Sequence, residues 1–412
     1  MIWRRCASLA SLASALAVAA ATSASADPRP VGLRPQPDSP EAGLWDTFDK
    51  VEQQAKLSAD LNADPVLNAY VHEVACKVAA EYCQELRIYV MDRPFMNAAM
   101  ASNGYSEVWS GLLLRVADEA ELAFVLGHEA SHFTENHSIE RHEAIKTRAN
   151  VAMAFSAGIA AVALVGAAHT VHSQGVSDIY DAAGSLVDLV YFTAAASLFS
   201  FTREQETEAD ILGLRRAAAA GYDTRAAASS WRSVLSESKA SDFKSVRNQE
   251  ARLGILDSHP LSSIRADALD LEASKLPVGG ASGRERHRAA IRPFLGAWLK
   301  DDLRRKDYGQ TLHVIDRLAA TGEDLGVLNF YRGETYRLRR GEDDVELAKQ
   351  AYEAAIAHSD APVAAWRELG EARRRAGDRA GAAQAFNDYL EKAPDAEDAW
   401  LVRDTLNSLQ GA

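Results

Sequence analysis

Three histidines and two glutamates fall within the twelve residues LGHEASHFTENH, Leu126 to His137. On a helix, His128 and His132 would share one face, so that both rings could reach a single metal ion. Glu129 follows His128 directly and could act as a general base on a water beside that ion. This is the arrangement of zinc peptidases, in which two imidazoles hold the metal and a neighbouring carboxylate moves the proton. The five-residue pattern alone also occurs by chance, so a third ligand is needed.

The candidates for that third ligand lie in REQETEADILG, Arg203 to Gly213. On a helix, Glu206 and Asp210 share one face, and Glu204 and Glu208 share another. Either pair could be solvated surface charge. The position of this acidic helix, downstream of HEASH and at the end of a long uncharged segment, favours a ligand instead.

Four segments together resemble the HtpX/BepA-type zinc metallopeptidases. They are HEASH, ETEAD with Gly213 after it, NAAMASNGYSEVWSGLL upstream, and DSHPLSSIR at Asp257 to Arg265. The resemblance implies one Zn²⁺ per chain, held by His128, His132 and Glu206. It assigns to Asp210 the role of orienting a ligand.

The resemblance also implies a fold and a way of binding substrate. We expect a mainly helical gluzincin domain with a small β-sheet, whose edge strand pairs with an extended substrate chain. The candidate edge strand is Ser106, Glu107, Val108 and Trp109, within the stretch that runs to Ser110. This chain has Ser102-Asn103-Gly104 where relatives often carry Pro-Asn-Gly, which bears on the rigidity of the strand but not on the metal site.

Three further residues near these motifs have open roles. The oxyanion that develops during peptide hydrolysis needs a donor besides zinc, and His259 and Arg265 are the available groups. His259 could instead take the fourth position on zinc and hold the enzyme latent, or cap a helix before Pro260. His137 would lie about 140° from His132 on a continuous helix, so we expect it beside the site or on the surface.

The elements that position these residues are marked in the sequence. Asp64-Pro65 suits the start of a helix, and Leu86 to Asp92 is typical of a strand. A turn is expected at Asn103-Gly104, with short extended pieces on either side. Asp118 with Glu121 predicts a capping box that begins the helix carrying HEASH.

An apolar insertion, about residues 150–201, separates His132 from Glu206. Its first part, Val151 to Ala168, could span a bilayer by length, but eight of its eighteen residues are alanine. A single crossing would put the two ligands on opposite sides, so the insertion forms either a membrane hairpin or helices buried over the domain. The alanine content and Asp188 favour buried helices, which could restrict entry to the site.

The C-terminal part has the 34-residue period of tetratricopeptide repeats. Trp366 recurs as Trp400, and Tyr352 precedes Phe386 by the same spacing. A weaker helix pair covers about residues 289–320. The alternative is an ordinary helical bundle.

These signals predict an order of domains. Residues 1–26 form a signal peptide, 27–43 an extended leader, 44–273 the metallopeptidase domain, 274–288 a linker and 289–412 the tetratricopeptide-like repeats. An uncleaved N-terminal anchor is the alternative to a signal cut near Ala26. Cleavage would leave 43 basic and 58 acidic side chains, a net charge of −15 instead of −13, which argues against a nucleic-acid partner.

The predicted location is the periplasm, with peripheral membrane association as an option. After cleavage only Cys76 and Cys83 remain, and the sequence leaves open whether they form a disulfide. A bridge would require the surrounding helix to end near Ala80.

We therefore predict a zinc endopeptidase of the bacterial cell envelope. Its substrates would be misfolded or stalled envelope or outer-membrane proteins, and its repeats would bind substrate or outer-membrane assembly partners. Two other functions compete: a non-proteolytic chaperone or assembly scaffold that acts through the repeats, and a membrane-integral protease.

Overall fold

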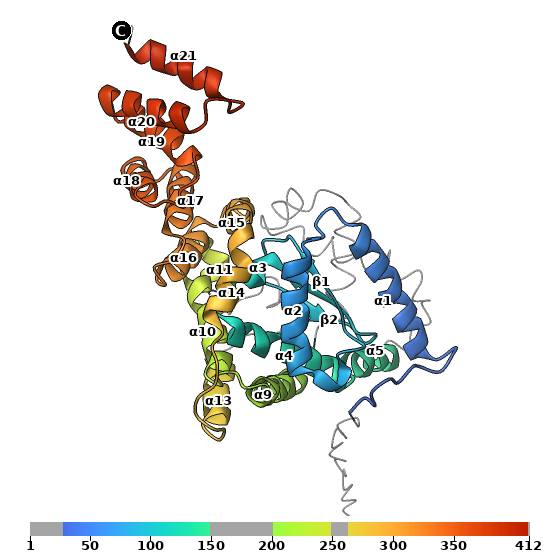
Figure 1. Ribbon diagram of the computed structural model, residues 1–412. Helices are drawn as coiled ribbons and strands as arrows, with labels where there is room; N and C mark the ends of the chain where they lie inside the picture. The colour runs from blue at the N-terminus through green and yellow to red at the C-terminus, as the bar shows by residue number, and fades with distance from the viewer. Residues whose placement is uncertain (1–27, 149–200, 249–262, 411–412) are drawn as a thin grey trace, which may run out of the picture.

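The computed structural model describes residues 28–148, 201–248 and 263–410 (Figure 1). The predicted signal peptide, almost all of the apolar insertion, and His259 lie outside the described residues. Among the described helices, none combines the length and the apolar character needed to cross a membrane.

The small sheet has three strands, β1 (Arg87–Met91), β2 (Ala98–Met100) and β3 (Tyr105–Trp109), in the order β1-β3-β2. Strand β1 runs parallel to β3, and β2 runs antiparallel to it. The turn before β3 contains Gly104 at φ +82°, where an added Cβ would lie 2.3 Å from the carbonyl oxygen of Glu85. Only glycine fits there, because the position combines a left-handed conformation with a close backbone contact.

The prediction that Ser106, Glu107, Val108 and Trp109 form the edge strand is wrong. They belong to β3, which is the central strand and is buried along its whole length. The physical reason is that β1, which precedes the β2–β3 hairpin in the chain, pairs with the second side of β3. Within the described part of the chain, β2 is paired on one side only.

Nine α-helices and a short 3₁₀ turn accompany the sheet within the described residues up to 273 (Figure 1). They are α1 (Pro40–Leu57), α2 (Pro65–Val78), η1 (Ala80–Tyr82), α3 (Ser110–Arg115), α4 (Glu119–Thr134), α5 (His137–Arg148), α9 (Arg203–Ala219), α10 (Ala226–Ala240), α11 (Lys244–Asn248) and α13 (Ser263–Ala273). Helix α4 packs against α2, α9, α10 and β2, and all of its residues are buried. The helix that carries HEASH is therefore the centre of the domain.

The predicted helix starts are largely present. Asp64 caps α2, and Pro65 is its first residue. Asp118 caps α4 by accepting a hydrogen bond from the backbone N–H of Glu121. The predicted capping box is only half formed, because the carboxylate of Glu121 accepts from the N–H of Ala117 rather than from that of Asp118.

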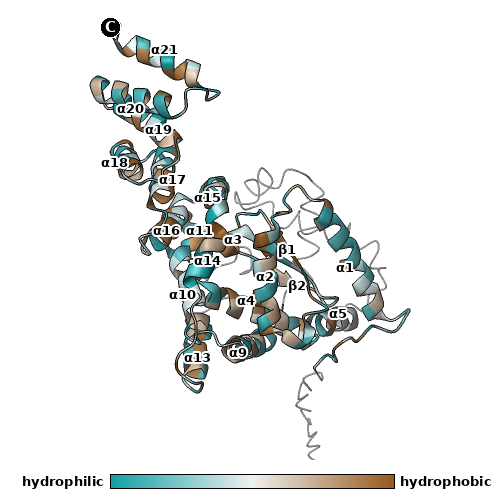
Figure 2. Cartoon of the chain, in the orientation of Figure 1, coloured by the Kyte–Doolittle hydropathy of each residue, from teal (hydrophilic) through white to brown (hydrophobic). Residues whose placement is uncertain are grey.

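A series of helices follows the sheet-containing domain. They are α14 (Arg284–Ile291), η2 (Arg292–Phe294), α15 (Leu295–Leu303), α16 (Tyr308–Ala319), α17 (Leu325–Arg339), α18 (Asp344–Ile356), α19 (Ala364–Arg375), α20 (Arg379–Lys392) and α21 (Ala399–Gln410). Helix α14 begins inside the predicted linker. Helices α14 to α17 share the core of the preceding domain through Ile291, Trp298, Ile315 and Leu328, whereas α18 to α21 extend away from it (Figure 1, Figure 2).

One contact recurs in the helical series. A Cβ on Gly333 of α17 would lie 2.4 Å from the ring of Tyr352 in α18, and a Cβ on Gly370 of α19 would lie 2.6 Å from the ring of Phe386 in α20. Each glycine lets an aromatic ring of the next helix sit against its backbone. The predicted mainly helical fold, with a small sheet and a C-terminal helical series, is confirmed.

The segment before α1 is partly buried. The backbone N–H of Arg29 donates to the carbonyl oxygen of Thr134 at 2.7 Å, and its Nη1 donates to the carbonyl oxygen of Ser102 at 3.2 Å. Its guanidinium lies 4.9 Å from the ring centroids of both Trp45 and Phe133. Instead of a simple extended leader, this segment joins the end of α4 to the turn before β3.

Cys76 and Cys83 form a disulfide, which settles the alternative that the sequence left open. Helix α2 ends at Val78, and the 3₁₀ turn η1 bends the chain back until the two Cα atoms are 4.8 Å apart. An unbroken helix would have kept them roughly 10 Å apart.

Candidate metal centre

The structure brings His128, His132 and Glu206 together in one buried group. The Nε2 atoms of the two histidines are 3.1 Å apart, and carboxylate oxygens of Glu206 lie 3.6 Å from each of them. Ligand atoms placed tetrahedrally at about 2.0 Å from a zinc ion are roughly 3.3 Å from one another. The three side chains thus have the spacing of a zinc site.

The contacts of the opposite ring nitrogens support the same conclusion. Nδ1 of His128 lies 3.1 Å from Oδ1 of Asp210, and a carboxylate at this distance favours the tautomer that has its proton on Nδ1 and its lone pair on Nε2. Nδ1 of His132 lies 2.8 Å from Nδ1 of His137, whose Nε2 is 3.4 Å from Glu208. If His137 donates to Glu208, His132 donates to His137, and the Nε2 of His132 is also a lone pair.

Two imidazole lone pairs and a carboxylate then converge on one buried point. Such electron-rich groups repel one another unless a cation lies between them. The donor set, two nitrogens and one oxygen, is typical of a catalytic zinc site with three protein ligands.

His137 lies beside the site, one of its two predicted places, but it does not reach this place on a continuous helix. Helix α4 ends at Thr134, and Asn136 adopts a left-handed conformation at φ +58° before α5 begins. The chain reverses there and returns His137 to the ring of His132. Asparagine is one of the few residues that tolerate this conformation, so Asn136 indicates a possible helix end, which the assumption of a continuous helix ignored.

The meeting of α4 with α9 depends on two glycines. A Cβ on Gly213 would lie 2.7 Å from the backbone nitrogen of His128, and a Cβ on Gly127 would lie 3.0 Å from the carbonyl oxygen of Gly213. The backbones therefore touch, and the ligands on both helices come within reach of one ion. A side chain at Gly213 would separate Glu206 from the histidines.

Asp210 joins a buried set of polar contacts behind the ligands. Arg265 donates to it from Nε at 2.7 Å and from Nη2 at 2.8 Å, and Trp231 donates from its indole nitrogen at 3.2 Å. Burial alone would raise the pKa of Asp210, but His128 and Arg265 lower it to about 2. The carboxylate is therefore ionised and available to the Nδ1 proton of His128.

Arg265 also reaches a ligand directly, since its Nη1 lies 3.0 Å from Oε2 of Glu206. These contacts support a role in positioning Glu206 and Asp210, and the predicted role of Arg265 in the transition state stays a proposal. Trp231, which the sequence did not single out, is a fully buried residue of α10 that lies edge-on to His128.

Glu129 and the surroundings of His132 complete the site. Glu129 is buried beside His128 on α4, at 2% exposure. The ring of Phe201 stacks on that of His132, with 3.7 Å between centroids and 11° between planes. Phe201 is the last residue of the predicted apolar insertion, so the chain returns from that insertion in contact with a candidate ligand.

Comparisons with known proteins agree with this geometry. The model of peptidase family M48 matches residues 62–273. The putative beta-barrel assembly-enhancing protease of Vibrio cholerae is 29% identical over 167 residues, which cover 40% of this chain and 32% of the relative. The mitochondrial metalloendopeptidase OMA1 of Bos taurus is 27% identical over 227 residues, 52% of this chain and 39% of the relative.

The beta-barrel assembly-enhancing protease of Escherichia coli K12 is 24% identical over 285 residues, 64% of this chain and 54% of the relative. The chain thus spans about a third to a half of the length of these curated relatives.

Proposed function

This chain belongs to peptidase family M48, and from that premise we propose that it is a zinc-dependent endopeptidase of the bacterial cell envelope. The observation that carries the proposal is the convergence of His128, His132 and Glu206 beside Glu129. No simpler structural role accounts for two imidazoles and a carboxylate that face one another in a buried site.

Each side chain has a role in peptide hydrolysis. A bound zinc ion supplies Lewis acidity, which polarises the scissile carbonyl and acidifies water. Glu129 takes the proton from the attacking water and delivers it to the leaving amine. Asp210 and His137 hold the two histidine rings in the tautomer that presents Nε2, and Arg265 holds Glu206.

Strand β2 is the proposed site for an extended substrate. It packs against α4, and among the described strands only β3 pairs with it. A substrate backbone added to the other side of β2 would run close to α4, the helix that carries His128 and His132. Backbone pairing gives affinity with little dependence on sequence, which suits a protease that acts on unfolded chains.

The cellular role is proposed from the relatives and from the predicted export signal. Two of the relatives are described as proteases that enhance β-barrel assembly. We infer that this chain acts in the periplasm on misfolded or stalled envelope and outer-membrane proteins. Its tetratricopeptide-like repeats would bind the substrate or an assembly partner.

Zinc content and casein cleavage of purified residues 27–412 test the proposal. Glu129→Gln should keep zinc and lose activity, whereas Glu206→Ala should lose zinc. Glu204→Ala is the matched control, because Glu204 lies exposed on the same helix and should change neither quantity. Absence of zinc from the unchanged protein would refute the site.

Glu129→Gln also distinguishes the proposed protease function from a function as a non-proteolytic scaffold. In a strain that lacks the gene, Glu129→Gln should fail to restore function if cleavage is required. Full restoration would show that the protein acts through its repeats without proteolysis.

A further inference from the structure

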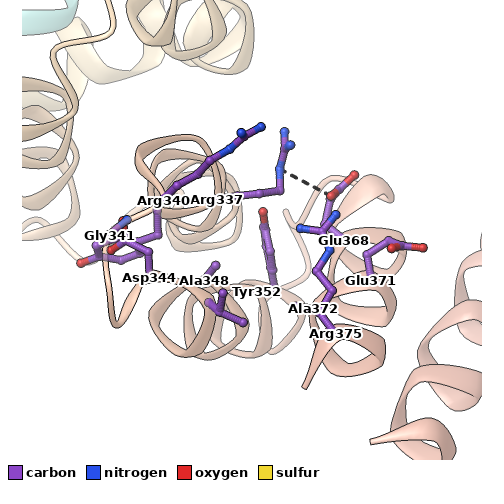
Figure 3. Close-up of a pocket in the computed structure, with 12 residues that line it drawn as sticks. Arg337, Arg340, Gly341, Asp344, Ala348, Tyr352, Glu368, Glu371, Ala372 and Arg375 are labelled. Atoms are coloured by element: carbon purple, nitrogen blue, oxygen red, sulfur yellow. Dashed lines mark hydrogen bonds and ion pairs between the residues drawn. The ribbon is translucent and has the colours of Figure 1, made fainter. Parts of the chain in front are cut away.

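We propose that a pocket between α17, α18 and α19 binds the free C-terminal carboxylate of an extended polypeptide whose last side chain is apolar. The proposal deepens the substrate-binding role given to the repeats, and rests on it. The pocket has a volume of about 370 Å³ and lies in the helical series, outside the metal centre (Figure 3).

The floor of the pocket is apolar and fixed in place. It is formed by the ring of Tyr352, which is 1% exposed, together with Ala348 and Ala372. The Tyr352 ring packs against Gly333, and its hydroxyl donates to Glu334 at 2.6 Å. Because Tyr352 is held on two sides, the floor offers a preformed surface for one apolar or aromatic side chain.

The acidic residues that line the pocket are already neutralised. Asp344 accepts two hydrogen bonds from Arg339, at 2.6 and 3.0 Å. Glu371 lies 2.8 Å from Arg374. Glu368 lies 2.7 Å from Arg367 and 3.6 Å from Arg337.

Two arginines of the lining differ from these. Arg340 follows the last residue of α17, and Arg375 is the last residue of α19; both are exposed. No side-chain hydrogen bond or ion pair joins either of them to another residue in the described ranges. Figure 3 shows the guanidinium ends of Arg337 and Arg340 on the same side of the pocket, beyond the Tyr352 hydroxyl. The pocket therefore offers two guanidinium groups that no carboxylate of the described residues neutralises, on a chain whose net charge is −13.

This combination selects a ligand class. A guanidinium binds a carboxylate through two parallel hydrogen bonds, which are among the stronger polar contacts in proteins. In a C-terminal residue, the carboxylate and the side chain are attached to the same carbon, so both can enter one pocket. In an extended chain, an internal acidic side chain points to the face opposite its neighbours. The geometry therefore favours a chain end.

Fluorescence anisotropy with labelled peptides tests the assignment. The full chain carries Glu129→Gln, so that no peptide is cleaved and binding is read independently of proteolysis. The probes are fluorescein-Gly-Ser-Gly-Ser-Leu-Phe with a free carboxylate, the same peptide with a C-terminal amide, and an amide in which Asp replaces Leu. We expect the free carboxylate to bind at least about tenfold more tightly than either amide.

Variants locate the binding. Arg340→Ala and Arg375→Ala should each weaken binding of the free carboxylate by roughly tenfold, and Arg340→Lys should restore part of it. Arg304→Ala is the control, because Arg304 is an exposed arginine after α15 that does not line the pocket. Ser in place of the terminal Phe should also weaken binding.

Three results would overturn the proposal. They are equal binding of the carboxylate and amide peptides, equal binding of the internal Asp peptide, and an Arg304→Ala effect as large as those at Arg340 and Arg375. Because Glu129→Gln cannot cleave, loss of peptide binding would count against this pocket and leave the proposed protease activity intact.

Discussion

We call the sheet-containing domain with α14 to α16, which share its core, the catalytic half, and α17 to α21 the repeat half. In the catalytic half, Arg115 is buried between Glu237 and Asp302, with donor–acceptor distances of 2.8 and 2.6 Å. In the repeat half, Arg340 and Arg375 are exposed at the rim of a pocket. The first arrangement fixes helices α3, α10 and α15 to one another. The second leaves donors available to a ligand. The difference teaches that one residue type serves rigidity in one region and recognition in the other, according to burial.

The same contrast holds for the metal centre. There, charged and polar groups are buried, and neighbours lie in contact with the three candidate ligands: Asp210 with His128, His137 with His132, and Arg265 with Glu206. A catalytic site needs fixed positions, whereas a recognition surface can tolerate side-chain freedom until its ligand arrives.

The largest expected effect tests the catalytic half alone. Glu129→Gln should lower kcat/KM for casein by about a thousandfold, because the general base is lost while the metal ligands stay. The measurement is steady-state hydrolysis beside zinc content. Arg375→Ala, in the repeat half, should leave hydrolysis of a short peptide unchanged. If Arg375→Ala also abolished that hydrolysis, the two halves would not be separable.

The next prediction concerns the buried ion pairs. Arg115→Leu should lower the free energy of unfolding by about 3 kcal/mol, because it removes the buried guanidinium that Glu237 and Asp302 share and leaves Arg305 alone to compensate two buried carboxylates. Denaturant unfolding measures the change. The control is Arg332→Leu, which removes a partly exposed pair with Asp316 and should cost less than about 1 kcal/mol. Equal losses would remove the contrast between the regions.

A smaller effect is expected at the contact between α4 and α9. Gly213→Ala should lower the free energy of unfolding by about 2 kcal/mol and weaken zinc binding, because its Cβ would lie 2.7 Å from the backbone of His128. Gly43→Ala in α1 is the control, since nothing lies within 4 Å of its added Cβ, and it should be neutral or stabilising. Unchanged zinc affinity in Gly213→Ala would show that the helices can separate without moving the ligands.

The smallest expected effect is the pH dependence of the buried pairs. Burial alone would raise the pKa of Asp302, but Arg115 and Arg305 lower it to about 2. The pKa is lower in the folded than in the unfolded chain, so this stabilisation is complete above about pH 4 and is lost as pH falls toward 2. The loss should be about 1 to 2 kcal/mol. Asp302→Asn should flatten this part of the stability profile, and an unaltered profile would contradict the assignment.

The sequence indicated which side chains the structure brings together, because helical spacing places His128 and His132 on one face; their role as zinc ligands stays a prediction. Glu206 came from its spacing to Asp210 and from the family resemblance. The predicted edge strand failed because strand order depends on which strands pair across the sheet, and β1 pairs with β3 rather than with β2, the strand that follows it in the chain. The residue types along β3 do not tell which strands pair with it.

The supporting contacts of the site were less predictable. Trp231 and Phe201 contact the histidines through tertiary packing. The sequence shows that these residues are apolar, but it does not show which side chains they pack against. His137 lies beside the site, which was one of its two predicted places, but the turn at the left-handed residue Asn136 that brings it to His132 was not predicted.

Arg29 makes the contacts of the N-terminal segment depend on residues that are synthesised after it. Its partners Glu85, Ser102 and Thr134 all follow it in the chain, so its full set of contacts cannot form until residue 134 has been synthesised. The described N-terminal segment therefore depends on residues more than a hundred positions away for part of its contacts. The predicted cut near Ala26 would place the new N-terminus close in sequence to Arg29, which donates a hydrogen bond to the last residue of α4. Cleavage and the docking of this segment on α4 would therefore involve the same few residues.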